Sequence, residues 1–135
     1  MKKSKRLKIL ICGDRDWHDQ YQIARRVHEL CLKFELTVIH GDCRGADRIG
    51  GSRAEAFGCT VRKYPAEWKR YGKSAGPIRN RQMLEEEDPD LVIGFHDDIK
   101  KSKGTRDMLK IAAKAGKFVE LIDRNGRVFL QKGTK

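Results

Sequence analysis

The sequence lacks the features that would direct the chain to a membrane, an export pathway or a zinc centre. No apolar stretch approaches the roughly 20 residues that a transmembrane helix needs. The basic N-terminus leads into only about six apolar residues, which is too short for a signal peptide. The four cysteines form neither a CxxC pair nor a zinc-ligand pattern. We therefore expect a cytoplasmic protein with reduced thiols, and no metal, cofactor or membrane partner.

Acidic residues are scarce relative to basic ones, with 19 against 30 and a net charge of +11. This excess predicts an anionic partner, such as a nucleotide, a phosphorylated metabolite or a nucleic acid. Part of it lies in expected basic tails over 1–6 and 132–135. The segment 62–81 adds seven basic residues against one acid, Glu67, between two predicted strands. That charge is therefore local to one part of the fold.

Internal repeats and low-complexity segments are also missing, and 135 residues suit one domain, here expected over 7–131. Apolar runs alternate with amphipathic segments, which predicts a mostly parallel sheet with helices on both faces. Strands are expected over 7–12, 36–40, 60–64, 91–95 and 118–122, and helices over 19–35, 46–57, 77–87 and 105–115. An Asn125-Gly126 turn predicts a C-terminal antiparallel edge hairpin. The fold class is a Rossmann-like doubly wound α/β sheet of order 3-2-1-4-5.

Two turns that contain glycine, at 40–47 and at 103–108, each lie between a predicted strand and the predicted helix that follows it. Such turns bind phosphate, because glycine lets backbone N–H groups approach an anion and the helix N-terminus adds partial positive charge. In an open α/β sheet, ligands bind beyond the carboxyl ends of the strands, where the strand order reverses. The candidate ligand-binding residues lie in the loops at that edge: Gly13, Arg15, Asp16, Trp17, Gly41, Asp42, Gly45, Ala46, Asp47, Trp68, Gly76, Arg79, Asn80, Gly104, Thr105 and Asp107.

Several of these residues have two interpretations. Asp47 could cap a helix or bind a ribose hydroxyl. Arg79 stands in the first turn of a helix, where the dipole disfavours a cation, and its guanidinium matches phosphate geometry. Trp17 and Trp68 could cover the core or stack on a base.

Five motifs in order resemble the YspA-type, cpYpsA-related branch of the SLOG superfamily, which is named after the Smf/DprA and LOG proteins. They lie at 13–17, 40–47, 65–68, 75–80 with Met83, and 102–108, and the resemblance runs over 7–122. It implies a Rossmann-like fold that binds a nucleotide or a nucleotide-derived small molecule. It also implies a place in nucleotide signalling or phage–host conflict, and assembly into a homodimer or a higher homo-oligomer.

The resemblance leaves two further functions open. LOG enzymes are phosphoribohydrolases, and similarity to their motifs at 79–83 and 104–105 would make Arg79 and Asp107 catalytic in cleaving a nucleotide N-glycosidic bond. Here Lys101-Ser102 replaces the leading glycines of the LOG loop, and Met108 replaces its final acid. DprA kinship and the net charge make single-stranded nucleic-acid binding the second alternative.

Overall fold

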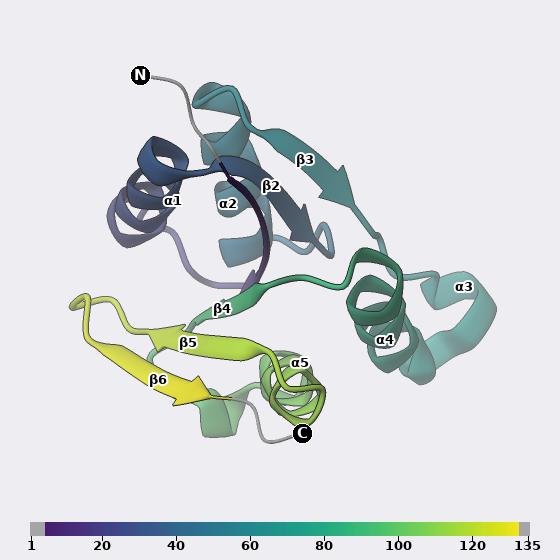
Figure 1. Ribbon diagram of the computed structural model, residues 1–135. Helices are drawn as coiled ribbons and strands as arrows, with labels where there is room; N and C mark the ends of the chain where they lie inside the picture. The colour runs from purple at the N-terminus through teal and green to yellow at the C-terminus, as the bar shows by residue number, and fades with distance from the viewer. Residues whose placement is uncertain (1–4, 133–135) are drawn as a thin grey trace.

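The computed structural model describes residues 5–132 as a six-stranded sheet of order β3-β2-β1-β4-β5-β6, with helices on both faces (Figure 1). The strands are β1 (Arg6–Gly13), β2 (Glu35–His40), β3 (Thr60–Lys63), β4 (Leu91–Phe95), β5 (Phe118–Ile122) and β6 (Val128–Lys132). The helices are α1 (Tyr21–Lys33), α2 (Ala46–Ala56), α3 (Trp68–Tyr71), α4 (Ala75–Glu87) and α5 (Lys103–Lys114), with 3-10 turns η1 (Gly72–Ser74) and η2 (Ile99–Lys101).

The two faces of the sheet bury two separate apolar clusters. One face, with Ile9 and Ile11 of β1, packs against α1 and α2. The other, with Leu10 of β1 and Val92 of β4, packs against α4 and α5. Adjacent residues of β1 point to opposite faces, so both must be apolar, which explains the unbroken hydrophobic run at this strand.

The predicted strand order is confirmed. Parallel pairing joins β1 to β2 and β4, β2 to β3, and β4 to β5, whereas β6 returns antiparallel to β5. The turn before β6 closes with a hydrogen bond from the Gly126 N–H to the Asp123 carbonyl, and Gly126 has φ 82°. The order reverses at β1, so the loops after β1 and β4 flank the switch point.

The structure differs from the sequence-based expectation mainly between β3 and α4. The segment expected as a loop over 65–77 contains α3 and η1, and α4 begins at Ala75 instead of Pro77. Pro77 fits inside the first turn because its missing N–H would have no intrahelical acceptor there. Helix α1 begins at Tyr21 instead of residue 19.

The expected basic tails fall largely outside the described residues. Strand β1 already begins at Arg6, and the Lys5 carbonyl accepts the Glu35 N–H, so the ordered sheet starts slightly before residue 7. At the other end β6 includes Lys132. Over 5–132, the helices are all too short or too polar to cross a membrane.

Candidate functional site

A cleft of about 370 Å³ opens at the carboxyl ends of the strands, at the switch point of the sheet. Residues from the loops after β1, β2 and β4 and from the start of α4 line it together. Predicted residues in its lining are Gly13, Arg15, Asp16, Asp47, Arg79, Asn80, Gly104 and Thr105. Turns that lie far apart in the sequence therefore share one cleft.

Arg79 is the buried cation of this cleft, with 9% of its surface exposed. Its Nη1 donates to the carbonyl of Gly41 at 2.7 Å and to that of Tyr64 at 3.4 Å, and its Nε donates to Asn80 Oδ1 at 3.1 Å. These partners fix the plane of the guanidinium without neutralising its charge. A guanidinium held in this way is prepared to receive an anion.

Arg79 packs closely against Gly41. A Cβ at Gly41 would lie 2.6 Å from Arg79 Cζ, so any side chain there would displace the guanidinium. The Gly41 N–H donates to Asp47 Oδ2 at 2.9 Å. Gly41 thus connects the buried cation to the buried acid.

Asp47 is a buried carboxyl in the cleft wall, and burial raises its pKa to about 6. The charge of Arg79 and the backbone N–H groups of Gly41 and Cys43 oppose that rise. Asp47 is thus held by backbone donors of the preceding loop, and it also faces the space where a ligand would lie.

We expect Asp47 to give the protein a stability that falls with rising pH. The unfolded carboxyl releases its proton near its ordinary pKa of 3.8, whereas the folded one keeps it to about 6. Between these values the folded state binds more protons, so stability falls as pH rises. Urea unfolding should show a fall on the order of 2–3 kcal/mol across this window that is missing in Asp47→Asn. Asp42→Asn serves as the control, and equal slopes in wild type and Asp47→Asn would contradict the expectation.

The loop between β2 and α2 uses many of its amides within the protein. The N–H of Gly41 donates to Asp47 Oδ2 and that of Asp42 to His40 Nδ1, and at the start of α2 the N–H of Ala46 donates to the Asp14 carbonyl. A Cβ at Gly45, which has φ 82°, would lie 2.6 Å from the carbonyl oxygen of Arg15. Gly41 and Gly45 thus allow close packing against distant segments, and the phosphate nest in this loop stays a prediction.

The start of α5 presents the second glycine turn to the cleft. Ser102 caps the helix by accepting the Thr105 N–H at 3.2 Å, and Ser102, Lys103, Gly104 and Thr105 all line the cleft. The first N–H groups of a helix have no intrahelical acceptor and carry partial positive charge. With Lys101 and Lys103 beside it, this helix start forms a positive wall opposite α2.

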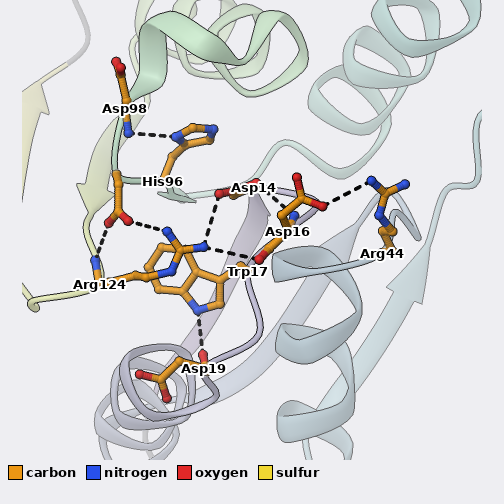
Figure 2. Close-up of polar contacts among 9 residues, drawn as sticks. Asp14, Asp16, Trp17, Asp19, Arg44, His96, Asp98 and Arg124 are labelled. Atoms are coloured by element: carbon orange, nitrogen blue, oxygen red, sulfur yellow. Dashed lines mark hydrogen bonds and ion pairs between the residues drawn. The ribbon is translucent and has the colours of Figure 1, made fainter.

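Trp17 lies in the core and has no exposed surface. Its ring packs edge-on against the Phe95 ring, with 5.7 Å between the ring centroids. Its indole N–H donates to the Asp19 carbonyl. The Arg124 guanidinium lies over the Trp17 ring, with its Cζ 4.8 Å from the ring centroid, and it also forms an ion pair with Asp14 (Figure 2). The interpretation of Trp17 as a base-stacking residue is therefore wrong, because its faces are already packed.

Asp107 lies outside the cleft lining. Its Oδ2 accepts a hydrogen bond from the amide nitrogen of Asn80 at 3.0 Å, and the same nitrogen donates to the Gly104 carbonyl at 3.3 Å. Asn80 in turn accepts from Arg79. Asp107 thus positions α4 against α5 and supports Arg79 through Asn80.

The remaining predicted residues lie beside the cleft. Ala46, which is buried, begins α2. Gly41, Asp42 and Trp68 line a neighbouring hollow, and Gly76 lies near the edge atom Cη2 of the Trp68 ring.

Sequence reasoning missed nine residues of the lining: Cys12, Asp14, Cys43, Arg44, Met83, His96, Lys101, Ser102 and Lys103. Most of them lie inside or next to the five sequence motifs, so their position in the chain alone could have indicated that they line the site. Cys12 directly precedes the motif at 13–17, but because it also continues the apolar run of β1, its residue type indicates a core position. Arg44 and Asp16, which both line the cleft, form an ion pair with an N–O distance of 3.3 Å (Figure 2).

Comparison with solved structures identifies relatives of the fold. DNA processing protein A (DprA) from Streptococcus pneumoniae superposes with a TM-score of 0.67 and 19% identity, over 87% of this chain and 50% of that one. A UDP-N-acetylglucosamine 2-epimerase superposes with a TM-score of 0.56 and 16% identity, over 87% of this chain and 33% of the other. The chain thus spans half or less of these proteins, and the likeness concerns the Rossmann-like fold.

Comparison of sequences identifies the family. The Gene 61 protein of Mycobacterium phage D29 is 35% identical over 118 aligned residues, covering 81% of this chain and 90% of the relative. Residues 7–71 match the YspA, cpYpsA-related SLOG family, which supports a role related to nucleotides or nucleic acids. With the five motifs, the fold and the phage relative in agreement, the chain belongs to the YspA, cpYpsA-related SLOG family.

Proposed function

We propose that this protein binds a nucleotide or a nucleotide-derived small molecule in the cleft at the switch point. The observation that carries the proposal is the buried Arg79, whose guanidinium is fixed by Gly41 and Asn80 and lines the cleft. Among residues 5–132 no carboxylate is bonded to Arg79, although its charge interacts with that of Asp47, and a buried guanidinium is costly unless an anion balances it. A phosphate group would supply that anion.

The surroundings of Arg79 favour a phosphorylated ligand over a plain carboxylate. Arg15, Arg44, Lys101 and Lys103 add positive charge around the opening, against the acids Asp14, Asp16 and Asp47. Asp14 is paired with Arg124, and the pair of Asp16 with Arg44 offsets one of these positive charges, which leaves Arg15, Lys101 and Lys103 around the opening. The phosphate would lie between Arg79 and the start of α5, and Asp47 would face ribose hydroxyls. Such a protein could sense or sequester its ligand.

The test is calorimetric titration with the four ribonucleoside 5′-monophosphates, together with native mass spectrometry for a co-purified nucleotide. We expect saturable binding of at least one nucleotide or retention of a nucleotide-derived molecule. If no nucleotide binds at high protein concentration and no nucleotide-derived molecule co-purifies, the proposal is overturned. Chromatography of the same mixtures detects free base, and its release would show an N-glycosidic hydrolase instead.

Salt dependence distinguishes the pocket from a strand-binding surface. A ligand held by one or two phosphate contacts loses little affinity between low and moderate salt. A single-stranded nucleic acid that contacts many basic side chains loses affinity steeply over the same range. A steep slope for an oligonucleotide, with no binding of mononucleotides, would favour the nucleic-acid alternative.

A further inference from the structure

A second hollow of about 430 Å³ opens beside the cleft. Pro65, Ala66 and Trp68 form one of its sides, and the loop after β2 forms another. Arg15, Cys43, Arg44 and Arg79 line both the hollow and the cleft. The two spaces are therefore neighbours across a short boundary that carries three guanidinium groups.

Arg79 stands at that boundary. Its Nη1 and Nε are held by Gly41, Tyr64 and Asn80, whereas its Nη2 contacts the Cys43 sulfur at 3.8 Å. A thiol is a weak acceptor, so the Nη2 side of the guanidinium can still bind an anion that bridges the two spaces. A phosphodiester between two nucleosides is such an anion.

Trp68 gives the second hollow an aromatic face. Its side chain is 48% exposed, and the ring lies against Gly76, where a Cβ would be 3.4 Å from Cη2. Trp68 is the first residue of the short helix α3, which is joined through η1 to α4, the helix that carries Arg79. An exposed indole beside arginines is a typical arrangement for stacking a base whose phosphate is held nearby.

We propose that the cleft and the hollow form one site for a 5′-phosphorylated dinucleotide. The terminal phosphate lies at the start of α5, the linking phosphate lies at Arg79 and Arg15, and the second base stacks on Trp68. This inference rests on the proposed function and names its ligand class. Each space alone is near the lower end of ligand-site volumes, and together they suit a ligand of two nucleotide units.

The experiment compares each of the four ribonucleoside 5′-monophosphates with its 5′-phosphorylated homodinucleotide by calorimetry. Wild type should bind at least one dinucleotide about 10-fold or more tighter than its mononucleotide, the gain expected from stacking one base. Trp68→Ala should remove that gain, so that the dinucleotide binds this variant no tighter than its mononucleotide. Tyr71→Ala is the matched control, because Tyr71 lies on the same short helix outside the lining of both spaces.

The outcomes separate this inference from the proposed function. Equal affinities for mono- and dinucleotides would overturn the two-part site and leave the proposed function standing. If the protein binds neither mononucleotides nor dinucleotides, both the two-part site and the proposed function are overturned. An oligonucleotide of about 12 residues that binds about 10-fold tighter than every dinucleotide would also overturn the inference, because it would indicate an open strand-binding groove.

Discussion

Replacing Arg79 by alanine is expected to abolish nucleotide binding while the protein stays folded. The lost guanidinium would contribute charge-assisted hydrogen bonds to phosphate, each worth about 1.5–3 kcal/mol. Two such bonds correspond to a loss of about 100-fold or more in affinity. Calorimetry with the nucleotide bound by wild type measures the change. Arg79→Lys keeps the charge without the planar fork and should give an intermediate affinity.

The matched control is Arg81→Ala on the same helix, because Arg81 is exposed and lies outside the cleft lining. It removes one positive charge from α4, so it corrects for any long-range effect of net charge. Circular dichroism and the Tm show whether Arg79→Ala still folds. Unchanged affinity in a folded Arg79→Ala protein would remove Arg79 from the site.

Replacing Trp17 by alanine is expected to cost about 3–5 kcal/mol of unfolding free energy, the usual penalty for truncating a fully buried aromatic. Trp17 fills the space between Phe95 and Arg124, and its indole N–H bonds the Asp19 carbonyl. Trp17→Phe keeps most of the volume and loses the hydrogen bond, so it should cost about 1–2 kcal/mol. Urea denaturation measures both values.

Trp17→Phe also separates the core role from a ligand role. Because Trp17 is fully buried, this variant should bind nucleotide with the affinity of wild type. Trp68→Ala should lose only the extra affinity for a dinucleotide, with stability almost unchanged because the indole is half exposed. A folded Trp17→Phe protein that loses ligand affinity without losing stability would contradict the placement of Trp17 in the core.

The strand order was predictable because its signals are local and strong. The runs at β1, β2 and β4 are apolar on both faces, which is typical of a sheet covered by helices on both sides. Alternation with helices then leaves few topologies, and the switch point follows from the strand order. The cleft therefore lies where the sequence analysis expected it.

The content of the loops was less predictable, because a loop is shaped by contacts with distant segments. The one-turn helix α3 has a weak local signal and packs against α4. Gly41 and Gly45 look like phosphate-binding glycines in the sequence. In the structure, Arg79 packs against Gly41, and the backbone of residues 14–15 packs against Gly45. A motif match cannot distinguish these two reasons for a glycine.

The amino-acid sequence by itself determined the Rossmann-like sheet, the edge where the cleft opens and the excess of positive charge, since each depends on residue type and period along the chain. Only the tertiary structure decided what each motif residue does. Trp17 and Trp68 both follow polar loop residues, yet one is sealed by Phe95 and Arg124 and the other faces the hollow beside Arg79. Asp47 and Asp107 likewise both stand near helix starts, and only Asp47 reaches the cleft. The physical reason is that burial and hydrogen-bond partners come from segments up to about a hundred residues away, as with Arg124 and Asp14.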